Sequence, residues 1–256
     1  MAIYTTDFSE YTSGVAPSDW TDRWDTDWTL TVEDNTADSI GAKVFKVNPG
    51  TTNVRRLVSW DDLDSDANRD DSELLVRVRA GATTNYNNMF SLMLRGSGAA
   101  GSENGYTLWM DGNDLELRKY VAGANSNLST ITSFVHAFKS SSTWDYSYFW
   151  LRFRANGTSL KAKAWSENQN EPDTWLIDET DSSISAAGWC GLCNFDAIGT
   201  QYVNADYFSI GTNGDSPTVP ISVTSETQLN QIILEVARAY TPPAGGTVAP
   251  IICINT

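Results

Sequence analysis

The sequence predicts an all-β protein: a two-sheet antiparallel sandwich with a short C-terminal extension. Short runs of alternating apolar and polar residues recur about every 12–15 residues, which is typical of strands buried on one face. Clusters of Gly, Asn, Asp and Pro separate these runs. No long amphipathic helical pattern occurs before residue 220, so the helices that connect parallel strands are missing.

Each expected strand is a run in which apolar, β-branched or aromatic residues recur at alternate positions. Turn-prone sequences such as VNPGTT, MDGNDL, RANGTS and ENQNEPD end the runs. The expected strands, in chain order, are 7–11, 26–32, 42–47, 54–60, 73–80, 88–95, 105–110, 113–120, 129–136, 147–155, 158–166, 174–180, 188–195 and 203–210.

Composition and charge exclude several classes of partner. The chain has 256 residues, 41% of them hydrophobic and 11% aromatic, which is sufficient for a large packed core. The formal net charge of -15 repels nucleic acid and anionic membrane surfaces, so we expect neither as a partner. No apolar run approaches the ~20 residues of a membrane-spanning helix. The N-terminus, MAIYTTDFSE, lacks the basic and apolar regions of a secretory signal.

The chain changes character near its end. We expect the sandwich to occupy residues 1–212, because the strand pattern stops there. Residues 213–220 have the Gly, Asp, Ser and Pro content of a linker. Residues 221–256 are too few to form a core, so they are predicted to dock on the sandwich, on another subunit or on a different protein. Their apolar positions fit either a helix or a strand, and those predicted to make assembly contacts are Leu229, Ile232, Ile233, Leu234 and Val236.

The run YFWLRFRANGTSLKAKAW, from Tyr148 to Trp165, predicts a β-hairpin with two different faces. Its core-facing positions are Phe149, Leu151, Phe153 and Leu160. Its outward positions form a cationic, aromatic face on an acidic protein: Trp150, Arg152, Arg154, Lys161, Lys163 and Trp165. This face is the candidate ligand-binding site. The alternative is that it is framework, with its cations paired to carboxylates of neighbouring strands or subunits.

The order of these segments resembles that of a known family. TDFSEYTSGVAPSDWTDRW, ELLVRVRA, GYTLWMDGNDLELRKY, the hairpin above, GWCGLCNF and VNADYFSIGT resemble the strands of concanavalin A-like lectin/glucanase jelly rolls, a group that includes laminin G-like domains. The resemblance covers residues ~5–212 and marks strands and turns rather than catalytic groups. The C-terminal LNQIILEVARAY resembles segments of bacteriophage structural proteins. The family's fold serves lectins, glycosidases and structural modules alike.

The resemblance also implies a structural calcium ion between the first and last strands, with Asp7 and Asp206 as the matching acids. The alternative for Asp206 is a turn cap or an ion pair with a nearby cation. A second acidic run, DDLDSDANRDDSE, has the spacing of a calcium-binding loop. It carries Ala67 where such a loop needs glycine, so a solvated acidic loop is favoured.

Catalytic signatures are weak. Retaining glycosidases need two carboxyl groups close together, and the nearest strand pair, Asp114 and Glu116, lacks the third acid of the family's motif. Cys190 and Cys193 match a redox Cys-x-x-Cys motif in letters, but no helix is expected after them, which favours packing. The single histidine, His136, lies in an apolar stretch. We therefore expect no enzymatic activity.

These observations predict a non-enzymatic structural protein of a bacteriophage particle, located in the virion on the exterior of the capsid or tail. Its partners would be other virion proteins and copies of itself. The alternative is a carbohydrate-binding module that attaches the particle to glycans of the host surface. A glycan hydrolase is the third and least favoured reading. No cofactor beyond the structural calcium ion is expected.

Overall fold

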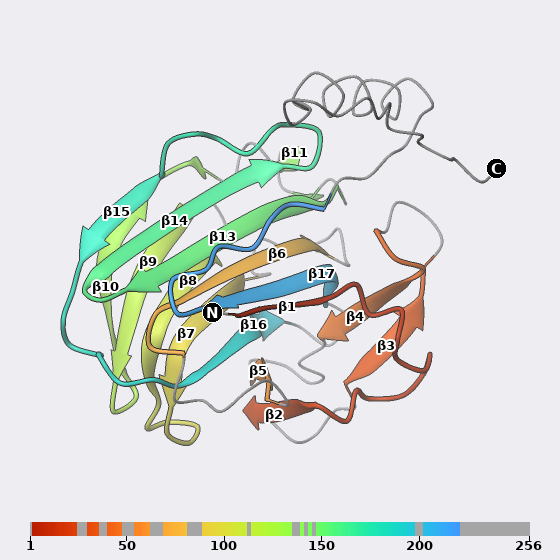
Figure 1. Cartoon of the computed structure of the whole chain (residues 1–256), viewed down its shortest axis with the longest axis horizontal. Helices are drawn as coiled ribbons and strands as arrows, with labels where there is room; N and C mark the ends of the chain where they lie inside the picture. The colour runs from red at the N-terminus through yellow and green to blue at the C-terminus, as the bar shows by residue number, and fades with distance from the viewer. Residues whose placement is uncertain are drawn as a thin grey trace, which may run out of the picture. The chain divides into compact units, whose positions relative to one another are not determined.

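The computed structural model confirms an all-β sandwich of two antiparallel sheets (Figure 1). It describes residues 2–24, 30–35, 40–47, 54–61, 69–80, 89–111, 114–134, 139–140, 143–144, 147–197 and 202–220. The chain divides into two compact units, Met1–Thr218 and Val219–Thr256, and the first of these is the sandwich. Among the described residues, no helix has the length and apolar character needed to cross a membrane.

One sheet has eight strands and contains both ends of the sandwich. The first strand, β1 (Ala2–Thr6), pairs with β17, the last, and places Ala2 opposite Thr212. Along the sheet the order is β15 (Ile177–Thr180), β14 (Ser159–Ser166), β13 (Phe149–Asn156), β6 (Ser72–Ala80), β17 (Val203–Thr212), β4 (Lys43–Val47) and β3 (Thr31–Asp34).

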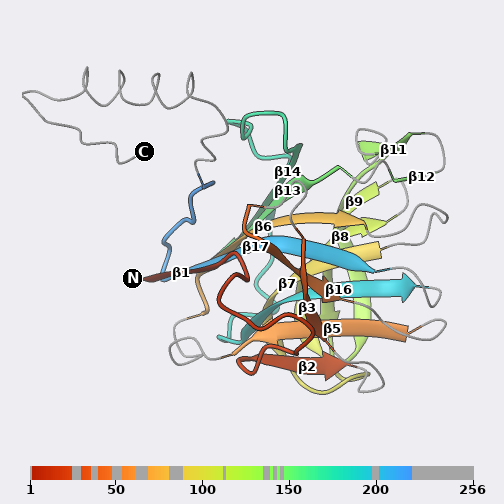
Figure 2. The ribbon, with the colours of Figure 1, turned by 90° about the vertical axis from the view of Figure 1, so that its right-hand side faces the viewer.

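The other sheet has seven strands, and Figure 2 shows three of them, β16, β5 and β2, following one another. Its order is β10 (Ala124–Ile131), β9 (Asp114–Val121), β8 (Asn104–Asp111), β7 (Met89–Ser97), β16 (Trp189–Ala197), β5 (Val54–Trp60) and β2 (Trp20–Trp24). A separate short pair is formed by β11 (Lys139–Ser140) and β12 (Thr143–Trp144).

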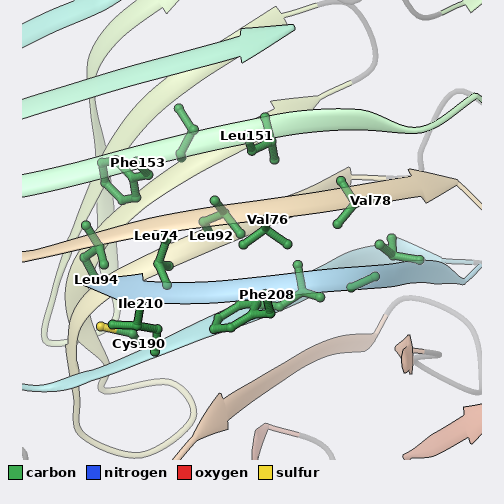
Figure 3. Packing of buried hydrophobic residues seen from close by; sticks show 14 of the residues in the cluster. Leu74, Val76, Val78, Leu92, Leu94, Leu151, Phe153, Cys190, Phe208 and Ile210 are labelled. Carbon is green, nitrogen blue, oxygen red and sulfur yellow. The ribbon is translucent and has the colours of Figure 1, made fainter. Parts of the chain in front are cut away.

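The main core lies between the sheets and follows from strand alternation. Leu151 and Phe153 of β13 point into this space together with side chains of the facing sheet such as Leu92 (Figure 3). Phe149 and Leu160 belong to the same buried cluster. All four predicted core residues of the hairpin therefore lie where their alternation placed them.

The expected strands 7–11 and 129–136 differ from the observed ones. The stretch 7–11 forms a turn, because the first strand precedes it at Ala2–Thr6, and the expected pattern also missed β2. The strand expected at 129–136 instead spans Ala124–Ile131. It starts early because the preceding turn has only two residues, Ala122 and Gly123, with φ values of 50° and 81°. Positive φ at both central positions is the tight hairpin turn that continues strand pairing directly.

The segment 213–218 is part of the sandwich rather than a linker. The Gly214 N–H donates to the Asp71 carbonyl at 3.2 Å, and the Pro217 carbonyl accepts a bond of 2.9 Å from Arg152. The Tyr207 hydroxyl donates to the Thr218 carbonyl at 3.2 Å. The predicted boundary at 212 is therefore too early, because the following residues satisfy polar groups of the eight-stranded sheet.

Arg95 of β7 joins the two sheets at one corner. Its guanidinium is 2% exposed and donates to the carbonyls of Asp70 (2.5 Å), Ile184 (2.8 Å) and Gly157 (2.8 Å). The Asp71 carboxylate lies 3.4 Å away. The backbone of Arg95 has φ 54°, uncommon for a residue with a side chain. A flat, five-donor group is suited to holding several separate acceptors in place.

We expect Arg95→Ala to lower the free energy of unfolding by about 3 kcal/mol, because it leaves buried carbonyls without donors. Arg95→Lys should restore only part of this loss, since one ammonium cannot reach acceptors spread over three segments. Urea denaturation measures both values. Arg154→Ala, which removes a half-buried arginine, is the matched control and should cost less than about 1 kcal/mol. Equal losses for the two alanine variants would show that Arg95 has no special role.

Candidate functional site

The predicted ligand face of the β13–β14 hairpin points away from the core, as its alternation indicates, but most of it is buried. Four of its six side chains belong to residues that are at most 7% exposed: Trp150, Arg152, Lys163 and Trp165. The side chains of Arg154 and Lys161 are 31% and 28% exposed. Solvent therefore reaches this face mainly at two cations.

The buried cations of this face are paired within the chain. Arg152 donates to the carboxylates of Glu73 and Glu171, the latter at 2.7 Å. Lys163 donates to Glu171 at 3.1 Å and to the Pro172 carbonyl at 2.6 Å. A buried charge is stable only when its hydrogen-bonding capacity is met in this way. These cations consequently have little capacity left for an anionic or hydroxylated ligand.

The aromatic residues of this face also pack against one another. The rings of Trp150 and Trp165 stack with centroids 6.1 Å apart, and Tyr207 meets Trp150 edge-on at 5.5 Å. Lys163 lies over the ring of Trp175 at 4.7 Å. The connection between β14 and β15 and the segment 213–218 thus contribute groups that close this face. Ligand binding here stays a prediction, and its accessible part is Arg154 and Lys161.

Asp206 lies at a bulge of β17 and is fully buried. Its Oδ2 accepts a hydrogen bond from the Ile40 N–H at 3.0 Å and pairs with the Arg77 guanidinium, which also pairs with Glu167. Its Oδ1 is buried and accepts no hydrogen bond from the described residues. Burial raises the pKa of Asp206 to about 7, although Arg77 favours the charged form.

The described residues do not fit a structural calcium ion at Asp7 and Asp206. Asp7 accepts bonds from the backbone and hydroxyl of Ser9, and Asp206 is paired with Arg77. Among the described ranges, no three His, Cys, Asp or Glu side chains are grouped closely enough to share a metal ion. Since Ca²⁺ needs six or more oxygen ligands, the structure favours the alternative for Asp206, the ion pair with a cation.

The two cysteines of GWCGLC point to opposite faces of β16, as the odd spacing predicts. Cys190 lies in the main core and Cys193 in a second apolar cluster, and both are buried. This burial favours the packing interpretation over redox chemistry. His136 and the five predicted assembly residues, Leu229, Ile232, Ile233, Leu234 and Val236, lie outside the described residues.

The second apolar cluster lies on the outer face of the seven-stranded sheet, because its members alternate with core residues along their strands. It consists of Leu57, Met93, Trp109, Tyr120, Trp189 and Cys193. Sequence reasoning did not identify this face as a candidate site. The signal was present in GYTLWMDGNDLELRKY, where Trp109, Glu116 and Arg118 alternate with buried leucines.

One end of this face combines an indole with polar side chains. The Arg118 guanidinium lies 4.3 Å from the centroid of the Trp109 ring and pairs with Glu116. The Tyr120 ring stacks with the Trp109 ring, and the two ring centroids lie 6.5 Å apart. The side chains of Arg118 and Glu116 are 20% and 11% exposed. The aromatic surface therefore holds the guanidinium in a fixed, partly solvated position.

The edge strand β10 extends this polar surface. Its pairing with β9 places Asn125 opposite Tyr120, Asn127 opposite Arg118 and Thr130 opposite Glu116. These three β10 residues are exposed, and the Asn127 amide donates to the Thr130 hydroxyl at 2.6 Å. We name this surface the β8–β10 patch, and its residues are Trp109, Glu116, Arg118, Asn125, Asn127 and Thr130.

The other end of the same face repeats the arginine-on-indole arrangement. Arg23 of β2 lies 5.5 Å from the Trp189 ring centroid and donates to Ser59 and Asp61, both at 2.7 Å. Against the effect of burial, hydrogen bonds from Ser59, Thr21 and Arg23 lower the pKa of Asp61. At this end the polar groups are therefore those of the Arg23–Asp61 ion pair and Ser59, whereas the β8–β10 patch also offers exposed amides.

Several solved structures are similar to this chain. The exoplasmic/lumenal domain of VIP36 in its Ca²⁺/Man-bound form has a TM-score of 0.53 and 10% identity, covering 78% of this chain and 85% of that one. A protein of unknown function from Shewanella oneidensis MR-1 has a TM-score of 0.50 and 13% identity, covering 85% and 89%. A carbohydrate-binding module, CBM66 from Bacillus subtilis, has a TM-score of 0.47 and 19% identity, covering 76% and 95%.

No family model and no curated protein matches the sequence. The first two structures above show that the chain has the lectin-like sandwich fold.

The raised pKa of Asp206 predicts a stability that falls as pH rises. In the unfolded chain the carboxyl titrates near 3.8, so between pH 4 and about 7 only the folded state retains the proton. The stabilisation that this carboxyl provides is fully present below the pKa of the unfolded state. It is lost as the pH rises from there through the pKa of the folded state, at up to about 1.4 kcal/mol per pH unit. Asp206→Asn should remove this dependence.

Urea midpoints of the wild type and Asp206→Asn between pH 5 and 8 measure the difference. Because groups that do not interact with Asp206 titrate equally in both proteins, the difference reports on Asp206 together with the groups coupled to it, such as Glu167. Asp178→Asn, at an exposed carboxylate paired with Lys161, is the control and should leave the pH profile unchanged. A stability difference between the wild type and Asp206→Asn that stays constant from pH 5 to 8 would show that the carboxyl is ionised throughout.

Proposed function

We propose that this chain is a carbohydrate-binding protein that contacts glycans through the β8–β10 patch. The observation that carries the proposal is the Arg118 guanidinium held 4.3 Å over the Trp109 ring, beside Glu116 and the exposed amides of β10. A guanidinium, a carboxylate and amides present donors and acceptors side by side, as the neighbouring hydroxyls of a sugar require.

The charge of the chain favours a neutral ligand over an anionic one. The net charge of -15 opposes the approach of polyanions, but it does not act on a neutral sugar. In the patch, Arg118 is already neutralised by Glu116. Recognition would then rest on hydrogen bonds with fixed geometry rather than on charge.

The fold is compatible with this proposal. The VIP36 domain with the same sandwich is described in a form bound to Ca²⁺ and mannose. Since a fold does not determine a function, this likeness supports the proposal only together with the patch. On the outer face of β13 and β14, the rival site, Glu171, Pro172 and Pro217 accept hydrogen bonds from Arg152 and Lys163, and Arg154 and Lys161 remain partly exposed.

A glycan array with the purified chain, followed by calorimetry on any sugar retained, tests the proposal. We expect binding, and Arg118→Ala should weaken it by about tenfold or more because both its donors and the orientation of Glu116 are lost. Asn127→Ala should weaken it less. Lys161→Ala removes an equal charge of similar exposure from the other sheet, and it should leave affinity unchanged.

The outcomes separate the two faces. Loss of binding in Lys161→Ala but not in Arg118→Ala would assign the ligand to the β13–β14 hairpin. No retention of any glycan at millimolar concentration would remove the carbohydrate-binding proposal. Thermal melts of each variant exclude unfolding as the cause.

We also propose that the chain acts on the exterior of a bacteriophage particle. The observation that favours this role is the separate C-terminal unit, Val219–Thr256, which follows the segment that closes the eight-stranded sheet. It contains the residues predicted to make assembly contacts, from Leu229 to Val236. Such a unit would join the sandwich to other virion proteins, while the β8–β10 patch would face host-surface glycans.

Deleting residues 221–256 tests this role. Because the segment 213–218 and its bonds to Arg152 and Tyr207 remain, we expect the truncated chain to fold with an unchanged melting temperature. It should fail to enter particles in a complementation assay, and it should keep its affinity for glycan. Incorporation of the truncated chain at wild-type level would contradict the assembly role.

A further inference from the structure

The edge strands of the two large sheets differ in how they are protected from pairing with other chains. An open strand edge carries unpaired N–H and C=O groups, and proteins commonly shield it with charges or by keeping the strand short. Three described edge strands follow this rule: β15 carries Asp178 and Glu179, β3 carries Glu33 and Asp34, and β2 carries Asp22 and Arg23. Each has five residues or fewer.

β10, at the remaining end of the two strand orders, lacks both kinds of protection, whereas β1, which pairs only with β17 among the described strands, is uncharged but has only five residues. β10 has eight residues, ANSNLSTI, with no charged side chain and no proline. Among the described strands it pairs only with β9. It lies within the longest stretch of the sequence without Asp, Glu, Lys or Arg, Tyr120–Phe138. In a chain with a net charge of -15, this is where a second copy meets the least electrostatic opposition.

The strand is exposed and regular enough to pair again. Five of its residues are exposed: Ala124, Asn125, Ser126, Asn127 and Thr130. Its one irregularity, between Asn127 and Ser129, lets Leu128 pack against the main core and leaves regular register on both sides. The core contacts of Leu128 and Ile131 hold the strand in position while its outer edge stays open.

We propose that β10 pairs antiparallel with β10 of a second copy, which joins two seven-stranded sheets into one continuous sheet. A two-fold axis places the two copies of β10 side by side and antiparallel, so each polar side chain of one copy lies opposite an uncharged residue of the other. Hydrogen bonds between the backbones and between Asn, Ser and Thr side chains supply the contact. An edge of eight residues buries less than a standard interface, so the dimer is expected to be concentration-dependent.

The pairing has a consequence that rests on the proposed function. Asn125, Asn127 and Thr130 belong both to β10 and to the β8–β10 patch. Pairing through β10 would place two patches next to each other on the same outer face. A branched or repeating glycan could then contact both, which raises apparent affinity by increasing the effective concentration of the second site.

Sedimentation velocity of the full chain, over roughly a hundred-fold range of concentration, tests the pairing without any glycan. We expect a monomer–dimer equilibrium in the wild type. Ser126→Asp and Ser126→Lys each bring like charges together across the two-fold axis, and each should weaken dimerisation at least about tenfold. Ser126 lies outside the patch, so glycan affinity per site should not change. A mixture of the two variants should recover a dimer, because opposite charges then face each other.

Ile3→Asp is the matched control. It adds the same charge to β1, another uncharged strand, at a side chain that is exposed to solvent, and it should leave the dimer intact. A wild type that stays monomeric at all concentrations would overturn the pairing, and so would a dimer insensitive to Ser126→Asp or abolished by Ile3→Asp. Because the readout is mass alone, failure of this test leaves the glycan proposal standing. Failure of the glycan array, in turn, leaves the dimer unaffected.

Discussion

The buried guanidinium of Arg95 is the interaction on which the arrangement of both sheets depends. It binds carbonyls from the entry to β6, the β13–β14 turn and the connection before β16, which are far apart in sequence. The neighbouring Asp71 accepts from the Gly157 N–H at 2.6 Å, and its carbonyl accepts from Gly214. The contacts at this corner therefore position the β13–β14 hairpin. They also fix the start of the segment 213–218, which then crosses the outer face of the hairpin. In a buried environment of low polarity, a guanidinium that lacked one of its hydrogen-bond acceptors would destabilise the fold. The segments that supply these acceptors are therefore positioned together.

Strand alternation was sufficient to predict the sandwich, its hairpin and the core positions of that hairpin. It failed at β10, whose Asn, Ser and Thr residues read as a loop because an edge strand exposed on most of its length has no apolar period. It also failed for residues 213–218, whose composition is that of a linker. There the order comes from bonds to Arg152, Asp71 and Tyr207, which are distant in sequence. Local sequence carries no record of such partners.

The same limit explains the candidate site. Alternation correctly placed Trp150 and Arg152 on the outer face, but orientation does not determine exposure. Glu171 and Pro217, which lie in two other segments, accept hydrogen bonds from Arg152 and cover this part of the face. The alternation of Trp109, Glu116 and Arg118 indicated the outer face that carries the β8–β10 patch. Nothing in that pattern distinguished this patch from the outer face of the hairpin. The difference lies in the neighbouring strand β10, which adds the exposed side chains of Asn125, Asn127 and Thr130 to the patch.

The acidic character of the chain connects these features. With carboxylates in excess, the cations of the outer faces form ion pairs inside the chain, as Arg152, Arg23 and Arg118 do. Surfaces that remain for recognition are then either acidic, which disfavours association of like copies, or uncharged. The longest uncharged stretch includes β10, which borders both the polar patch and the open edge of its sheet. Hydrogen bonding by neutral amides and hydroxyls suits both a sugar and a second strand, so the single strand β10 would serve both of the proposed contacts, neither of which charge opposes.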